Sequence, residues 1–341
     1  MLRRFLMAVS ASDRMEKIVI TAPVARDVVA RFVAGATQDD ALGVTRQLLG
    51  RGLLVTLDYL GEHTTDPDQA AAVADEYISL LGKLSGDGQA RASAAEVSVK
   101  PTAVGLGLAS SAGTTPYGAS SAGTTPYGAS SAGTTPYGSD HGEKIARENI
   151  TRICAAARDA GTTVTLDMEE HHLVGPVLRM LHELRADFPD LGCVIQSYLR
   201  RSEADCAALA AAGSRVRLCK GAYGAPEQVA FTSRREIDLS YVRCLKALLA
   251  GPGYPMLATH DPRLIEIAGG QAILAGRSVE SFEYQMLYGI RPTEQRRLAA
   301  TGAQMRVYVP YGSDWYGYLV RRLAERPANL GFFLRSLATK R

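Results

Sequence analysis

The sequence lacks the features that mark several large classes of protein. No uninterrupted apolar run approaches the roughly 18 residues that a membrane-spanning helix needs. Charge is nearly balanced, with 38 lysines and arginines against 35 aspartates and glutamates, so a dedicated nucleic-acid binder is not expected. The five cysteines are odd in number and no two are spaced as CxxC. A disulfide scaffold and a zinc finger are therefore not expected, and a reducing compartment is.

The composition is that of an ordinary globular protein. Of its residues, 46% are hydrophobic and 21% are charged, which excludes wholesale disorder. The length of 341 residues is enough for a large single barrel. Arg3 and Arg4 precede a short apolar stretch that ends at Ser10. A signal peptide needs a longer apolar region, so we expect a short amphipathic helix here rather than a cleaved signal.

Residues 1–50 predict a helical arm. Apolar residues recur at helical spacing over Val24–Ala34 and again over Asp39–Leu49, before Gly50. The rest of the chain, 51–341, is expected to form one further domain. Three helix-end signals are specific: Gly161 and Gly213 are expected at left-handed helix ends, and Ser202 as a helix N-cap.

From about residue 51, short apolar runs alternate with longer amphipathic stretches. Eight runs predict strands: Leu53–Leu60, Glu96–Lys100, Val164–Glu169, Cys193–Leu199, Val216–Tyr223, Pro255–His260, Phe282–Gly289 and Met305–Gly312. Eight stretches predict helices: Asp68–Leu84, Glu143–Ala160, Val174–Asp187, Glu203–Ala212, Ile237–Ala250, Pro262–Ala275, Pro292–Ala300 and Asp314–Arg326. Strict alternation implies parallel strands, and eight units favour a closed (βα)8 TIM-like barrel of the α/β class over an open doubly wound sheet.

One segment interrupts this alternation. The decapeptide ASSAGTTPYG occurs three times in tandem over residues 109–138. Each copy is small and polar, and its proline disfavours a helix. We therefore expect a disordered low-complexity insertion after the second strand, with a binding tail or a lid as the alternative.

Polar residues gather at the carboxyl ends of the predicted strands. They are Lys100, Asp167, Gln196, Arg217, Lys220, Thr259, His260, Gln285 and Tyr308. In a barrel these ends meet at one mouth, where catalytic residues lie. A single strand-end lysine or arginine is more often a salt-bridge partner, but so many together predict a site. Lys100 or Lys220 could alternatively serve as the amine nucleophile of a Schiff-base lyase.

The last predicted helix carries a basic face. Tyr318, Arg321, Arg322 and Glu325 are spaced so that they share one side of a helix. Two adjacent guanidinium groups can bind a small carboxylate bidentately. A solvated basic face is the alternative interpretation.

Two other patterns predict no site. Gly105-x-Gly107-x-x-Ser110 lacks the third small residue and the downstream acid of a dinucleotide-binding motif. The run Glu169–His172 places neighbouring side chains on opposite sides of an extended chain, which does not suit metal ligation, so no metal site is expected.

The motifs at these strand ends resemble those of the short, monofunctional bacterial proline dehydrogenases. The similarity runs through almost the whole chain from residue 50. The matching segments are SVKP (Ser98–Pro101), VTLDMEE (Val164–Glu170), VIQSYLRR (Val194–Arg201), VRLCKGAY (Val216–Tyr223), ATHDPRL (Ala258–Leu264), FEYQMLYGIRP (Phe282–Pro292) and RVYVPYGSDWYGYLVRRLAERPANL (Arg306–Leu330).

The resemblance implies a distorted (βα)8 barrel that holds FAD and oxidises L-proline to 1-pyrroline-5-carboxylate. Hydride passes from the ring carbon next to nitrogen to flavin N5, and electrons then pass to a quinone. It also implies a cytoplasmic protein, with peripheral contact at the inner face of the cell membrane left open, and a separate pyrroline-5-carboxylate dehydrogenase downstream. The oligomeric state is left open, as is a non-catalytic barrel that uses its repeat for binding.

The resemblance also implies roles for individual residues. Catalytic roles fall to Asp167 and Arg217. Substrate contacts fall to Lys100, Arg321, Arg322, Tyr308, Tyr318 and Leu287. Flavin contacts fall to Met168, Gln196, Arg217, Lys220, Gly221, Ala222, Thr259 and His260. Two features depart from the family pattern: Pro101, where an aliphatic residue is expected after Lys100, and the repeat insertion.

Overall fold

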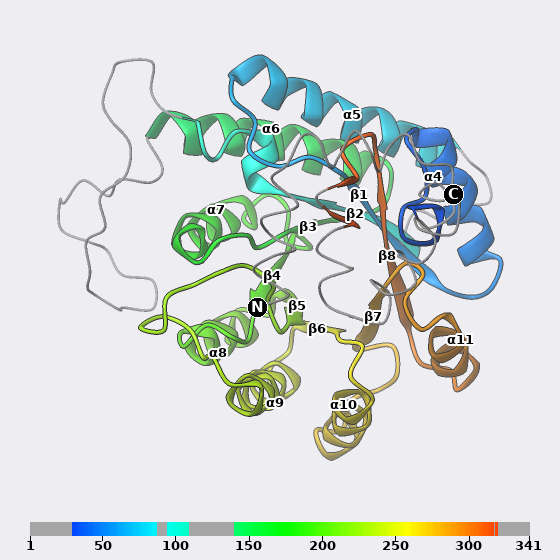
Figure 1. Cartoon of the computed structure of the whole chain (residues 1–341), viewed down its shortest axis with the longest axis vertical. Coiled ribbons are helices and arrows are strands. Elements are labelled where there is room, and N and C mark those ends of the chain that lie inside the picture. The colour runs from blue at the N-terminus through cyan, green and yellow to red at the C-terminus, as the bar shows by residue number, and fades with distance from the viewer. Residues whose placement is uncertain (1–28, 87–93, 109–139, 317, 320–341) are drawn as a thin grey trace, which may run out of the picture.

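The structure is a computed structural model of the chain, and it describes residues 29–86, 94–108, 140–316 and 318–319. In this part of the chain, eight parallel strands form one closed barrel in the order β1 to β8 (Figure 1). Pairing of β1 with β8 closes the cylinder. The predicted (βα)8 barrel is thus confirmed. The strands are β1 Leu54–Tyr59, β2 Ala95–Val99, β3 Val164–Leu166, β4 Gly192–Gln196, β5 Arg215–Cys219, β6 Tyr254–Ala258, β7 Glu283–Leu287 and β8 Met305–Tyr311.

Helices surround the barrel on its outside (Figure 1). They are α4 Gln38–Leu49, α5 Pro67–Gly86, α6 Asp140–Asp159, α7 Val174–Leu184, α8 Ser202–Ala211, α9 Arg234–Ala250, α10 Pro262–Leu274 and α11 Pro292–Ala300. Two short 3-10 helices, η2 Pro101–Val104 and η3 His171–Leu173, follow the carboxyl ends of β2 and β3. In the described ranges, no helix combines the length and apolar character needed to cross a bilayer.

Local signals explain where several elements begin and end. Thr37 caps α4, because its hydroxyl accepts from the Asp40 N–H while the Asp40 carboxylate accepts from the Thr37 N–H. Gly161 and Gly213 have the predicted left-handed conformation, with φ of 71° and 65°. The prediction for Ser202 is wrong: Arg201 occupies the N-cap, and the Ser202 hydroxyl instead donates to the Gln196 carbonyl over 2.6 Å.

The expected helical arm is described only in part. Within it, α4 packs against β1 and β8 and buries Ala41, Leu42 and Leu48. The amphipathic helix expected near Arg3 lies outside the described residues. The division at residue 50 therefore stays a prediction.

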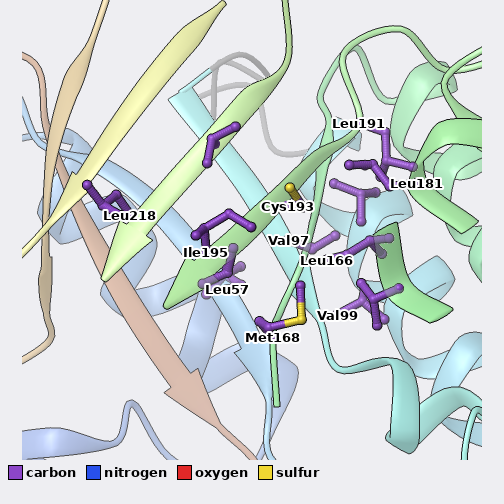
Figure 2. Close-up of a cluster of buried hydrophobic side chains, with 14 of the residues drawn as sticks. Leu57, Val97, Val99, Leu166, Met168, Leu181, Leu191, Cys193, Ile195 and Leu218 are labelled. Atoms are coloured by element: carbon purple, nitrogen blue, oxygen red, sulfur yellow. The ribbon is translucent and has the colours of Figure 1, made fainter. Parts of the chain in front are cut away.

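The hydrophobic core lies between the strands and the surrounding helices. Alternate strand residues point outward and are almost fully buried, as the two-residue period of a strand requires. Figure 2 shows this layer around Leu57, Val97, Val99, Leu166, Cys193, Ile195 and Leu218, with Leu181 and Leu191 beside it.

By contrast, charged side chains occupy the inside of the barrel. At the amino end, Arg306 of β8 donates to Glu283 of β7 over 2.7 Å, and Arg215 of β5 donates to Glu96 of β2 over 2.8 Å. Glu96 and Arg215 come from strands that are not neighbours in the sheet, so they meet across the interior. This amino-end cluster, made of Glu96, Arg215, Glu283 and Arg306, replaces the branched apolar layers that usually fill such barrels.

The amino-end cluster predicts a dependence of stability on acid. Burial works to raise the pKa of Glu96, but Arg306, Arg215 and Arg217 lower it from 4.5 to about 2. A carboxylate whose folded pKa is depressed stabilises the fold above its unfolded pKa and loses that contribution as pH falls through the folded pKa. Glu96 therefore contributes fully above about pH 4.5, and its contribution disappears as the pH falls toward 2.

We expect Glu96→Gln to lower the free energy of unfolding by about 3 kcal/mol at pH 7 and to flatten its decline between pH 4.5 and 2. Urea unfolding followed by circular dichroism at a series of pH values measures both effects. The matched control is Glu148→Gln, because Glu148 is exposed and lies 3.9 Å from Lys144. If the free energy of unfolding falls equally steeply between pH 4.5 and 2 in the wild type and in Glu96→Gln, this account is wrong.

The repeat insertion lies outside the described residues, but its two flanks are described. A Cβ added to Gly142, in the first turn of α6, would lie 2.6 Å from the Leu108 carbonyl oxygen. Gly142 is therefore in direct contact with the chain just before the repeat. The insertion leaves and rejoins the barrel at nearly the same place.

Candidate active site

The site begins with a buried ion pair that the sequence did not predict. Asp58, near the end of β1, receives a 2.5 Å hydrogen bond from the Lys100 ammonium group, which follows β2. Only 1% of Asp58 and 7% of Lys100 are exposed. Asp58 was not predicted as a site residue because it lies in the mostly apolar strand Leu54–Tyr59. A charged residue inside such a strand was the available signal.

Burial and charge act in opposite directions on this pair. Burial raises the pKa of Asp58 to about 6, although the Lys100 ammonium works to lower it. Burial alone would lower the pKa of Lys100, but the Asp58 and Asp167 carboxylates raise it above its ordinary value. Lys100 is therefore a cation at neutral pH.

Next to this pair lies a second set of connected side chains. The Arg217 guanidinium donates to Asp167 Oδ1 and to Ser98 Oγ, each over 2.8 Å, and to Gln285 Oε1 over 2.6 Å. The Tyr308 hydroxyl donates to Asp167 Oδ2 over 2.7 Å, and the Arg217 group lies over the Tyr308 ring. The predicted catalytic residues Asp167 and Arg217 are therefore in direct contact.

Tyr308 joins the two sets. Its hydroxyl also interacts with Asp58. Burial, reinforced by the Asp167 and Asp58 carboxylates, raises the pKa of Tyr308 well above its ordinary value. The phenol therefore stays neutral and keeps its proton for donation.

Gln196, the last residue of β4, carries a buried acceptor atom beside Gly221. The Gln196 side-chain N–H donates to the carbonyls of Met168 and Glu169, over 2.6 and 2.9 Å. Its Oε1 atom is buried and has no hydrogen-bond partner in the part of the chain that the structure describes. Gly221 has φ of 99°, and an added Cβ would lie 3.1 Å from that oxygen and would clash with the Tyr198 ring. The N–H of a flavin ring would satisfy this acceptor.

The remaining predicted flavin contacts lie on the loops after β5 and β6. Lys220 forms ion pairs with Asp238 over 2.6 Å and with Asp261 over 3.2 Å. Ala222 is half-buried two residues further along. Thr259, whose hydroxyl accepts from the Asp261 N–H, is almost fully buried.

His260 connects this loop to the next strand. Its Nε2 atom accepts from the Leu287 N–H over 3.0 Å, so the ring proton lies on Nδ1. The Arg291 guanidinium donates to the His260 carbonyl over 2.8 Å. These bonds bring the predicted flavin contact His260 beside the predicted pocket residue Leu287.

The helix face that was predicted to bind the substrate carboxylate is described only in part. Tyr318 is buried, with 6% of its surface exposed. Arg321 and Arg322 lie outside the described residues, as does Glu325. Their place at the site therefore stays a prediction.

The mouth also carries a group of potential metal ligands. Glu62, His63 and Glu169 bring one ligand atom each within 4.8 Å of one another. Both Glu169 oxygens already accept hydrogen bonds from Thr102, at 3.0 Å from its N–H and 2.5 Å from its hydroxyl. His63 lies 3.4 Å from the Glu170 carboxylate. We assign these residues to the hydrogen-bonding framework of the mouth.

The surroundings of the two lysines weigh against the Schiff-base alternative. That chemistry needs a neutral amine, which a desolvated lysine provides only when its pKa is lowered. The pKa of Lys100 is raised instead, and Lys220 is paired with two carboxylates.

Comparison with known proteins identifies the family. Residues 41–335 match the family described as Proline dehydrogenase. The chain belongs to the proline dehydrogenase family. Proline dehydrogenase 1 of Bacillus subtilis (strain 168) is 34% identical over 312 residues, which cover 91% of this chain and 90% of that protein. Proline dehydrogenase of Deinococcus radiodurans is 34% identical over 309 residues, which cover 90% and 89%. The resemblance seen in the sequence is confirmed.

Solved structures of the proline dehydrogenase family share the fold. Proline utilization A (PutA) from Bdellovibrio bacteriovorus, inactivated by N-propargylglycine, superposes with a TM-score of 0.74 and 26% identity. The match covers 88% of this chain and 33% of the PutA chain, so this member of the proline dehydrogenase family spans about a third of that protein.

Proposed function

We propose that this chain oxidises L-proline to 1-pyrroline-5-carboxylate with FAD as its cofactor. The supporting observation is that Asp167, Arg217 and Tyr308 form one hydrogen-bonded set inside the barrel of a proline dehydrogenase family member. Tyr308 connects this set to Asp58, and Lys100 belongs to it through its hydrogen bond to Asp58.

Cationic groups orient the substrate in this proposal. Proline carries a carboxylate on a small apolar ring, and Lys100 with Arg321 and Arg322 binds that carboxylate. Tyr308, Tyr318 and Leu287 form the walls of the pocket around the ring. The cationic surroundings also favour the neutral form of the proline amine, which hydride loss requires.

FAD, when bound, would supply the hydride acceptor, N5, for the proline ring carbon next to nitrogen. Arg217 would stabilise negative charge on the flavin, and Asp167 holds the Arg217 guanidinium in place. The open Gln196 oxygen accepts a ring N–H. Met168, Lys220, Gly221, Ala222, Thr259 and His260 complete the proposed set of flavin contacts.

The surrounding roles follow from the same proposal. Electrons pass from the flavin to a quinone, which requires contact with the inner face of the cell membrane by a protein of the cytoplasm. A separate dehydrogenase consumes the pyrroline-5-carboxylate product.

An absorbance spectrum tests the proposal directly. The purified chain is expected to show an oxidised flavin spectrum that bleaches when L-proline is added without oxygen and returns with a soluble quinone. D-proline serves as the control. A colourless protein, or a flavin that L-proline does not reduce, would refute the proposal.

Deletion of residues 109–138 is expected to leave flavin content and proline turnover within about twofold of the wild type, because closing a shorter loop costs little. Leu108 and Gly142, in the first turn of α6, are in contact, so a short connection is enough to join the two flanks. Turnover and bound flavin are measured on both chains. Loss of turnover in a folded deletion variant would contradict this expectation and would favour a functional role for the repeat.

A further inference from the structure

Thr102 lies where three loops of the catalytic mouth meet. It is the second residue of η2, two positions after Lys100, and only 1% of it is exposed. Its hydroxyl accepts from the His63 N–H over 3.2 Å and donates to Glu169 Oε1 over 2.5 Å. One side chain therefore links the loop after β1 to the loop after β3.

The Glu169 side of this link is rigid. Glu169 is 1% exposed, and its second oxygen accepts from the Thr102 backbone N–H over 3.0 Å. The Glu169 carbonyl accepts from Gln196 over 2.9 Å, which connects the link to β4. Burial raises the pKa of Glu169 to about 7, against the two hydrogen bonds from Thr102. The two hydrogen bonds from Thr102 fix the orientation of the Glu169 side chain.

The loop after β1 is held by the backbone of the same residue. The Thr102 carbonyl accepts from the Thr64 N–H over 3.3 Å and from the Thr64 hydroxyl over 3.1 Å. His63 adopts φ of 55°, a left-handed conformation that is unfavourable for a residue with a side chain. The bonds to Thr102 hold this conformation in place.

Only one residue, Pro101, separates Lys100 from Thr102. A residue before proline is restricted to extended conformations, and Lys100 has φ of −82° and ψ of 119°. Proline also suits the first position of a helix, and the Pro101 carbonyl accepts from the Leu106 N–H over 2.9 Å. The backbone of Lys100 therefore has little freedom to move unless Thr102 moves with it. The departure from the family pattern at Pro101 stiffens this turn.

We propose that Thr102 is a positioning residue for proline binding: its hydroxyl fixes the turn that carries Lys100 against the loops after β1 and β3. The proposal rests on the proposed function, since it assigns Lys100 to the substrate carboxylate. The hydroxyl acts on substrate binding through Lys100 and makes no contact with the reacting atoms. It should therefore affect KM far more than kcat.

Three variants test the role of the hydroxyl. Thr102→Val keeps the shape and removes the donor and acceptor, and we expect it to raise KM for L-proline about tenfold with kcat and flavin content within about twofold. Thr102→Ser keeps the hydroxyl and should restore KM to within about twofold of the wild type. The matched control is Thr45→Val, because Thr45 is fully buried and donates to the Ala41 carbonyl in α4, far along the chain from Lys100.

The outcomes are distinct. If Thr102→Val has the KM of Thr45→Val, or if Thr102→Ser is as impaired as Thr102→Val, the positioning role is wrong. Should Thr102→Val not fold, Glu169→Gln carries the same test, because the glutamine oxygen can replace only one of the two accepting Glu169 oxygens and its N–H₂ group cannot accept a hydrogen bond. A wild-type chain that does not oxidise proline would overturn the proposed function and this inference together, whereas an active wild type with unchanged variants overturns only the inference.

Discussion

Exchange of Lys100 for methionine is expected to raise KM for L-proline by about 30- to 1,000-fold, which corresponds to the ~2–4 kcal/mol lost when one member of a buried charge pair is removed. Lys100 is the one cation of the proposed carboxylate site that the described residues include, and it is almost fully buried. Methionine has a similar length and adds no charge. Steady-state kinetics give KM, and the absorbance spectrum gives the flavin content.

Two control variants distinguish an effect on substrate binding from an effect on folding. Lys83→Met removes a lysine that lies 2.9 Å from Asp39 on the surface, and it should leave KM unchanged. Lys100→Met leaves the buried Asp58 carboxylate without its cation. The double variant with Asp58→Asn should therefore recover stability without recovering KM. A normal KM in a folded Lys100→Met protein would rule out the proposed role of Lys100.

A second large effect is expected at the opposite end of the barrel. Arg306→Leu should lower the free energy of unfolding by about 3–5 kcal/mol, the typical cost of leaving a buried carboxylate without its cation. Arg306 is 4% exposed, and it donates to Glu283, which is fully buried, and to the Val55 carbonyl over 2.8 Å. Urea unfolding monitored by circular dichroism measures the change.

The controls again use charge pairs of different burial. Arg297 pairs with Glu294 over 2.7 Å on the exposed face of α11, and Arg297→Leu should have little effect. Adding Glu283→Gln to Arg306→Leu removes the stranded charge and should recover part of the lost stability. If Arg306→Leu unfolds at the same urea concentration as Arg297→Leu, the amino-end cluster does not stabilise the barrel.

Periodicity was sufficient to predict the outside of this molecule. Outward-facing residues such as Val97 and Leu166 pack against helices, so each strand carried an apolar signal and each helix an amphipathic one. Strand ends were predicted less well. The third strand was expected to reach Glu169 but ends at Leu166, because η3 begins at His171 and the chain turns toward the mouth.

The inside of the barrel was harder to predict, for a physical reason. Glu96 and Arg215 are 119 positions apart, and a pair made across the interior leaves no local pattern in the sequence. Asp58 was missed in the same way, since its partner Lys100 lies 42 positions further along the chain, just after β2. The local signs that the inward face is polar were a charged residue within an apolar strand, as at Asp58, and alternating charged residues, as in Arg215 and Arg217.

A barrel lined by ions responds to heat differently from one lined by branched apolar side chains. Exposing polar groups lowers the heat-capacity change of unfolding, whereas exposing apolar groups raises it. The penalty for removing ions from water also falls as temperature rises. The ion pairs of Arg306 and Arg215 therefore make the free energy of unfolding of this chain vary less with temperature than its length alone suggests.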